Sequence, residues 1–241
     1  MLTVTNLSKR FGGFLAVNQV SFDVRAGEIL GLIGPNGSGK STTFNVIAGM
    51  LRPSGGSIRF EGAEVAGLPA HRICRRGIAR TFQIPRPFRK LALLENVTLA
   101  AYYGAGGSIG RAEARHRAEE ALSLVGLPTA ATSVTDGLGA AALKKLELAR
   151  ALATKPRLLL ADESLGGLDA TEMLNAARLL ETIRSRMNVT VIWVEHIMGV
   201  LMSVVDRVIV LDHGEKIFEG LPKDAARDAR VIEVYLGQRR T

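Results

Sequence analysis

The sequence lacks the features of a secreted or membrane-spanning chain. Its single cysteine, Cys74, cannot form an internal disulfide, and a lone thiol fits a reducing compartment. The most apolar region, 189–211, is interrupted by charged side chains, whereas a spanning helix needs about 20 nearly uninterrupted apolar residues. The start of the chain also lacks the basic, apolar and small-residue segments of a secretion signal. These absences predict a globular protein that stays in the cytoplasm.

Aromatic residues make up only 5% of the chain, and its net charge is +8. A positive charge suits nucleic acid, an anionic membrane surface or nucleotide phosphates, so charge alone does not choose between these partners. The low aromatic content disfavours binding of single strands by base stacking. We therefore expect no nucleic-acid partner.

The apolar pattern that is present predicts an α/β fold. Near-continuous apolar runs are separated by stretches long enough for helices, as in a parallel sheet, and lie at 29–33, 158–161, 189–194 and 208–211. Apolar residues at every second position in 17–24 indicate a half-exposed strand, which together with 57–60 predicts a separate small antiparallel sheet.

The region from 91 to 154 is rich in alanine, leucine and charge at helical spacing. Within it, the glycine-rich segment 104–110 predicts a surface loop. We expect one domain, 1–241, in which a helical subdomain (91–154) is inserted into a catalytic lobe (1–90 and 155–241).

The segment GPNGSGKS, from Gly34 to Ser41, matches the pattern of phosphate-binding loops and directly follows a buried strand. Its glycines let backbone N–H groups turn around phosphate oxygens, and the next helix presents its positive end. Lys40 would reach the β and γ phosphates, and Ser41 would bind Mg²⁺. The predicted nucleotide-binding residues are Gly34, Pro35, Asn36, Gly37, Ser38, Gly39, Lys40, Ser41 and Thr42.

Two adjacent carboxylates, Asp162 and Glu163, follow the apolar run 158–161. Ligands gather at the carboxyl ends of strands in open α/β sheets. Asp162 is expected to hold Mg²⁺ through its water shell, and Glu163 to polarise the attacking water as general base. With the phosphate loop, this pair predicts a P-loop NTPase.

The order of these motifs makes the sequence similar to the ABC ATPase family over nearly its whole length. The ordered set consists of Phe11, 34–42, Gln83, the helix expected after Leu138, Asp162 with Glu163, Asp169, and His196. The resemblance implies an ABC-type nucleotide-binding domain with ATP and Mg²⁺ as cofactors, which works as one half of a dimer.

The same resemblance implies roles for single residues. Phe11 would stack on adenine, and Asp169 would belong to a loop that crosses the dimer interface. The expected catalytic residues are Glu163, His196, which donates to the γ-phosphate, and Gln83. The expected metal ligands are Ser41, Gln83 and Asp162.

One segment departs from the family pattern. The family has Leu-Ser-Gly-Gly-Gln at the start of a helix that clamps the nucleotide of the opposite subunit. The corresponding residues lack the serine hydroxyl, a glycine and the glutamine; they are Leu138, Gly139, Ala140, Ala141 and Ala142. Only the helix N-terminus, with its unpaired N–H groups, remains. A heterodimer whose partner ATPase supplies an intact segment would explain this. A smaller departure is Ala161, where the family has a large apolar residue.

The regions 71–104 and 219–237 are similar to the ATPase subunits of branched-chain amino acid importers and their amide and urea relatives. The resemblance implies membrane-spanning permease partners, an indirect link to a substrate-binding protein, and a place on the inner face of the membrane. In the family a permease helix docks just after Gln83, so the candidate docking residues are Pro85, Arg86, Pro87, Phe88 and Arg89.

Other interpretations stay open. A largely non-hydrolysing, ATP-sensing half of a heterodimer would explain the altered segment, although Glu163 and His196 argue against it. Lipopolysaccharide-export ATPases share the general layout. Nucleic-acid ABC ATPases insert long coiled coils or carry two nucleotide domains, and 241 residues hold neither. The transported molecule is not identified, because selectivity lies in other chains.

Overall fold

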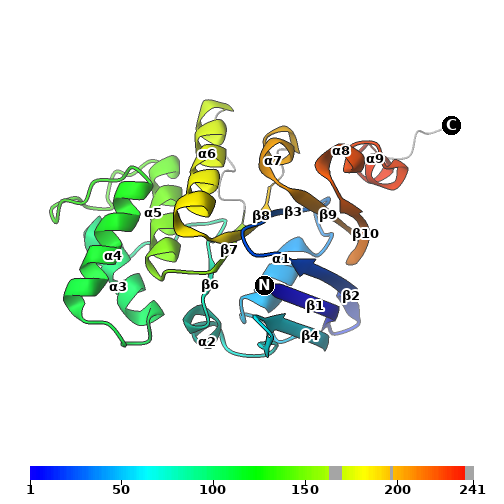
Figure 1. Ribbon diagram of the computed structural model, residues 1–241, viewed down its shortest axis with the longest axis horizontal. Coiled ribbons are helices and arrows are strands. Elements are labelled where there is room, and N and C mark those ends of the chain that lie inside the picture. The colour runs from blue at the N-terminus through cyan, green and yellow to red at the C-terminus, as the bar shows by residue number, and fades with distance from the viewer. Residues whose placement is uncertain (163–169, 196–197, 237–241) are drawn as a thin grey trace.

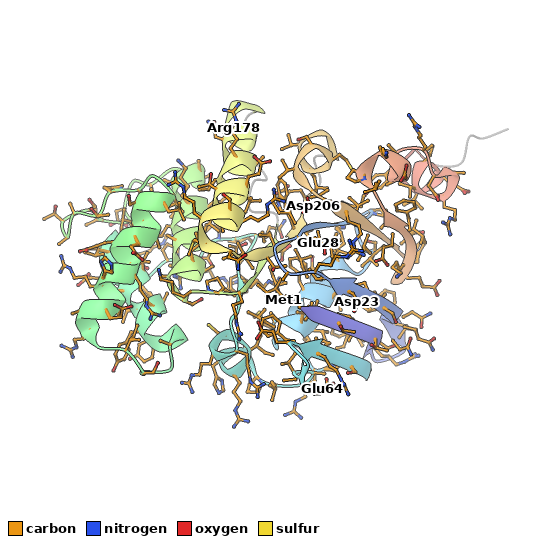
Figure 2. All side chains as sticks on the ribbon, in the orientation of Figure 1. Met1, Asp23, Glu28, Glu64, Arg178 and Asp206 are labelled. Atoms are coloured by element: carbon orange, nitrogen blue, oxygen red, sulfur yellow. The ribbon has the colours of Figure 1, made fainter. Side chains whose placement is uncertain are left out.

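A six-stranded sheet forms the centre of the computed structural model, which describes residues 1–162, 170–195 and 198–236 (Figure 1). Its strand order is β10-β9-β3-β8-β7-β6. Neighbouring strands in this sheet are parallel, except for the antiparallel pair β9 and β10. The strands are β3 (Ile29–Ile33), β6 (Ile78–Arg80), β7 (Leu158–Asp162), β8 (Thr190–Val194), β9 (Arg207–Asp212) and β10 (Glu215–Gly220). Each of the four apolar runs becomes a strand of this sheet, so the predicted α/β fold is confirmed.

A smaller antiparallel sheet and the helix α1 (Lys40–Ile47) cover one face of the larger sheet. Because strand side chains alternate between faces, Leu30 of β3 packs with Phe44 of α1 on this side, while Ile29 faces the other helices. The strand order of the smaller sheet is β2-β1-β4-β5. Its strands are β1 (Leu2–Phe11), β2 (Phe14–Val24), β4 (Gly55–Phe60) and β5 (Ala63–Glu64).

Further helices lie on the opposite face and at both ends of the larger sheet (Figure 1). They are α6 (Ala170–Met187), α7 (Met198–Val204), α8 (Pro222–Ala225) and α9 (Ala229–Leu236). The short helix α2 (Ala70–Arg75) lies next to β6, and its Ile73 packs on the same side as α1. In the described part of the chain, no helix combines the length and apolar character needed to cross a bilayer.

Three helices between β6 and β7 pack on one another at one end of the molecule, drawn in green in Figure 1. They are α3 (Leu93–Gly104), α4 (Arg111–Leu124) and α5 (Ala140–Ala153). The prediction that Gly104 belongs to a loop is wrong, because it is the last residue of α3. A Cβ there would lie 2.6 Å from Cγ2 of Thr154, so this glycine allows the end of α3 to approach the end of α5.

Candidate functional site

The phosphate loop joins the end of β3 to the start of α1. Gly34 has φ +149°, and a Cβ there would lie 2.1 Å from the carbonyl oxygen of Leu211 in β9. Gly39, with φ +100°, is the N-cap of α1, and its Cβ would lie 2.7 Å from the carbonyl oxygen of Ala16. Both neighbours are backbone atoms that cannot rotate away, so only glycine fits at either end of the loop.

A two-residue hairpin turn between β9 and β10 is hydrogen-bonded to the phosphate loop. His213 and Gly214 connect β9 to β10 with φ of 44° and 82°, the paired positive values of a tight hairpin. The Gly214 N–H donates to the carbonyl oxygen of Ser38 at 3.1 Å, and the Gly214 carbonyl accepts from the N–H of Asn18 at 2.8 Å. The sequence analysis missed this support, although the dipeptide between two apolar runs was its signal.

Lys40 is the first residue of α1 and its side chain curls back over the loop. The residue is 5% exposed, and its ammonium group donates to the carbonyl oxygens of Gly34 and Pro35, both at 2.8 Å. The first turn of α1 holds no acidic residue. The positive end of the helix and this ammonium group therefore face the same loop, an arrangement that binds anions.

Ser38 provides a separate indication that the loop is built for a ligand. Its hydroxyl oxygen is buried and has no hydrogen-bond partner among the described residues. A buried polar atom without a partner is destabilising, and a phosphate oxygen would satisfy it. The loop residues thus fit a phosphate group.

Three predicted metal ligands line one cavity of about 430 Å³. Ser41 comes from α1, Gln83 from the segment after β6, and Asp162 from the end of β7. Their hydroxyl, amide and carboxylate oxygens are hard donors, and Mg²⁺ characteristically uses few protein oxygens and keeps several waters. The donor set fits Mg²⁺, and the structure brings together residues far apart in the sequence.

Asp162 is 4% exposed and forms an ion pair that the sequence analysis missed. The guanidinium of Arg80 donates to its Oδ2 at 2.6 Å, and the two side chains are 8% and 5% exposed. The backbone N–H of Asp162 donates to the hydroxyl of Thr81 at 3.1 Å. No motif marks Arg80, because only the parallel pairing of β6 with β7 brings it to this carboxylate.

The predicted adenine-stacking residue, Phe11, lies at the end of β1. Phe11 pairs with Phe14 at the β1–β2 turn, and Ala16 of β2 lies against Gly39. The Phe11 ring is 45% exposed, and the ammonium group of Lys9 lies 5.0 Å from its centroid. One face of the ring is thus occupied by a cation.

The segment after Gln83 is fixed to α5 by Arg150. Its guanidinium donates to the carbonyl oxygen of Arg86 at 3.0 Å and to Glu147 at 2.9 Å, and it lies 5.5 Å from the centroid of the Phe88 ring. Glu147 is 7% exposed, and this burial raises its pKa above the ordinary 4.5, although the charge of Arg150 opposes the shift. The α5 helix is thereby tied to the predicted docking segment.

The altered segment 138–142 does begin a helix. Gly139 is the N-cap of α5 with an extended backbone (ψ 168°), has no side-chain cap, and is exposed together with Ala140. None of the five residues lines the cavity that holds Ser41, Gln83 and Asp162 in the described structure. The first N–H groups of α5 have no intrahelical partner and belong to an exposed helix end.

Three predicted site residues, Glu163, Asp169 and His196, lie outside the described ranges 1–162, 170–195 and 198–236. Their roles remain predictions from the sequence.

Comparison with protein families and curated relatives gives a consistent result. The family model described as ABC transporter matches residues 17–166. The branched-chain amino acid transport ATP-binding protein BraF of Pseudomonas aeruginosa is 36% identical over 99% of this chain and 98% of its own length. LivG of Escherichia coli, named for the same transport, is 34% identical over the same shares. The lipopolysaccharide export ATP-binding protein LptB of Escherichia coli is 32% identical over 98% of this chain and 97% of its own.

Solved structures agree with the fold. A nucleotide-free ATP-binding cassette from an ABC transporter superposes with a TM-score of 0.88 at 27% identity, covering 99% of both chains. The ADP conformation of the cassette MJ1267 gives 0.87 at 27% identity with the same coverage. The dimeric, ADP- and phosphate-bound cassette MJ0796 gives 0.81 at 28% identity and covers 92% of this chain and 99% of its own.

Proposed function

This chain belongs to the ABC transporter family, and from that premise we propose that it is the ATP-hydrolysing subunit of an importer for branched-chain amino acids or related amides. One observation carries the chemical part: the phosphate loop, Ser41, Gln83 and Asp162 meet around a single site. The substrate class follows from relatives that span nearly the whole chain and carry that transport in their names.

ATP binds with its phosphates on the loop. The backbone N–H groups and Lys40 hold the β and γ phosphates, and Phe11 offers its uncovered face to the adenine. Ser41, Gln83 and Asp162 would hold Mg²⁺, which would neutralise part of the phosphate charge. Lys40 exchanges its carbonyl contacts with the loop for the more strongly binding phosphate oxygens.

Hydrolysis needs a general base and a hydrogen-bond donor in addition to these residues. We assign Glu163 to polarise the attacking water and His196 to donate to the γ-phosphate, both from the sequence motif. Gln83 orients the water from the segment that is tied to α5. Nucleotide hydrolysis and the position of the docking segment are thereby linked.

The working unit is a head-to-tail dimer. The dimeric cassette MJ0796 supports a dimer, and the exposed N-terminus of α5 is accessible to a second subunit. In the dimer, residues 138–142 and Asp169 face the nucleotide of the other subunit. Because 138–142 lack the usual hydroxyl and glutamine, the second subunit is a different ATPase that supplies an intact segment.

Permease subunits dock on the exposed apolar side chains that surround the segment after β6. Ile84 is 69% exposed, Phe88 is 51% exposed and Met50 is 51% exposed, beside the exposed Arg86 and Arg89. Contiguous exposed apolar side chains of this kind mark protein contacts. The protein is therefore peripheral on the inner face of the membrane, and a substrate-binding protein acts indirectly through the permease.

A second candidate is ATP hydrolysis for lipopolysaccharide export, because LptB is similar over nearly the whole chain. Reconstitution with permease subunits of the branched-chain amino acid type separates the two, since only an importer moves branched-chain amino acids inward. Lipopolysaccharide extraction by the same complex would replace the first proposal with the second.

The first experiment measures Mg-ATP hydrolysis by the purified chain over a wide range of protein concentration, with Glu163→Gln as the blank. Turnover that rises with concentration and vanishes in the blank shows a productive homodimer. ATP binding without turnover at any concentration supports the heterodimer. Absence of ATP binding would contradict the proposed function.

A further inference from the structure

Arg80 joins three parts of the candidate site. Its guanidinium donates to Oδ2 of Asp162 in β7 and to Oδ1 of Asn45 in α1, both at 2.6 Å. It also lies 5.1 Å from the ring centroid of Phe82, the residue before Gln83, and 5.8 Å from that of Phe44 in α1. One side chain therefore contacts the phosphate-loop helix, the metal-binding carboxylate and the Gln83 segment.

The geometry leaves half of the Asp162 carboxylate available. Arg80 occupies Oδ2, whereas Oδ1 accepts no hydrogen bond from the described residues. The planar guanidinium donates in two fixed directions, so the bond to Asn45 determines the direction of the bond to Asp162. The carboxylate is thereby held in one rotamer, with Oδ1 directed away from Arg80.

We propose that Arg80 is a positioning residue of the metal site, which fixes the Asp162 carboxylate so that Oδ1 serves the water shell of Mg²⁺ when a nucleotide is bound. This inference rests on the proposed ATP-binding function. It predicts that loss of Arg80 weakens the gain in nucleotide affinity that Mg²⁺ provides, while leaving metal-free nucleotide binding intact.

Two other roles for Arg80 give different results. If its charge merely repelled a divalent cation, removing it would strengthen the effect of Mg²⁺. If the ion pair only stabilised the fold, removing it would lower stability and leave the effect of Mg²⁺ unchanged. The sign of the change therefore identifies the role.

The test is calorimetric titration of ADP into the full chain, in EDTA and at increasing Mg²⁺ concentration. For Arg80→Met we expect an ADP affinity in EDTA within about twofold of the wild type and a Mg²⁺-dependent gain smaller by about tenfold, as for a lost charged hydrogen bond. Arg80→Lys keeps the charge but cannot donate in two fixed directions, so its gain should be intermediate.

Arg157 provides a matched control. It too pairs with a carboxylate, Glu61, and lies 5.4 Å from an aromatic centroid, that of Phe60, but it is remote from the candidate site. Arg157→Met should leave the effect of Mg²⁺ on ADP affinity unchanged. Asn45→Ala removes only the acceptor of the second hydrogen bond of the Arg80 guanidinium, and it should reduce the effect of Mg²⁺ on ADP affinity. This variant replaces Arg80→Met in the test if Arg80→Met does not fold.

The outcomes are distinct. The proposal is overturned if the increase in ADP affinity on adding Mg²⁺ is unchanged or larger in folded Arg80→Met protein. It is also overturned if the ADP affinity of the wild type does not depend on Mg²⁺. Loss of ADP binding by the wild type in EDTA and in Mg²⁺ alike would instead overturn the proposed function.

Discussion

Ala161 of β7 lies opposite Trp193 of β8 in the parallel register, and Gly31 of β3 lies opposite the same tryptophan on its other side. Neighbouring strands are about 4.8 Å apart, so register partners pack side by side on one face of the sheet. The indole is fully buried, and the small side chain of Ala161 packs in the same apolar cluster. The family has a large apolar residue at the position of Ala161. In this chain Trp193 of the neighbouring strand provides that apolar volume.

Ala161→Leu should therefore destabilise the fold. The added side chain has to share the space of the Trp193 ring, and overpacking of a core costs about 1–3 kcal/mol. Urea unfolding followed by circular dichroism measures the change in the free energy of unfolding. The double variant Ala161→Leu/Trp193→Leu should lose less than the sum of the single losses, because the new leucine fills the vacated volume. Strictly additive losses would show that the two side chains do not compete for space.

Restoring the family pattern at the start of α5 should raise ATP turnover by the chain alone. Gly139 is the N-cap, so Gly139→Ser supplies a capping hydroxyl, and Ala140→Gly, Ala141→Gly and Ala142→Gln complete the segment. A donor aimed at developing charge contributes roughly 10²-fold or more, so at least about a tenfold increase is expected in a dimer. The measurement is steady-state phosphate release, and the same changes with Glu163→Gln are the control. Unchanged turnover in a dimerising protein would mean that 138–142 do not limit the reaction.

Glu147 should make stability depend on pH. Its folded pKa lies above the unfolded 4.5 because it is buried, so the folded state holds its proton at higher pH than the unfolded state does. The stability from this group is fully present below pH 4.5 and is lost as pH rises through the folded pKa. Glu147→Gln keeps a hydrogen-bond acceptor for Arg150 without titrating.

The difference in unfolding free energy between the wild type and Glu147→Gln, measured by urea unfolding from pH 4.5 to 8, isolates this effect from other titrating groups. The wild type should lose stability relative to the variant as pH rises. A difference that is flat or of opposite slope would show that the charge of Arg150 outweighs the burial of Glu147.

Ile84→Asp should block assembly with the permease. The side chain is 69% exposed, so the change removes no core packing, but it places a charge where apolar contact is expected. Co-purification with permease subunits should fall by about tenfold or more. Val134→Asp, at a 57% exposed valine before α5, is the matched control and should assemble normally. Equal loss in both variants would argue against docking at Ile84.

The larger strands could be predicted from the sequence because burial on both faces leaves a continuous apolar run, as in 29–33 and 158–161. The short elements β6 and α2 left no such signal, since three and six residues are too few to show a period. The phosphate loop was recognised by its motif, because its backbone geometry demands glycine at particular positions. Asp162 and Glu163 were assigned from their place after an apolar run.

Arg80 and Arg150 could not be predicted, because each acts through a neighbour that only the folded chain provides. A surface arginine and a buried one have the same sequence signature, and burial of a charge becomes visible only with its partner. Membership of the ABC family and the importer class were predicted correctly, whereas the roles of the individual site residues, among them Glu163, Asp169 and His196, stay predictions.

Trp193 is the only tryptophan in the chain, and its indole nitrogen is buried without a hydrogen-bond partner among the described residues. An indole in such a dry, apolar place emits at short wavelength, and it shifts to the red when water reaches it. Because it lies between the strand that leads into the phosphate loop and the strand that ends at Asp162, its emission reports on the middle of the sheet alone. The protein thus contains a built-in optical probe, and opening of its core can be followed without any label.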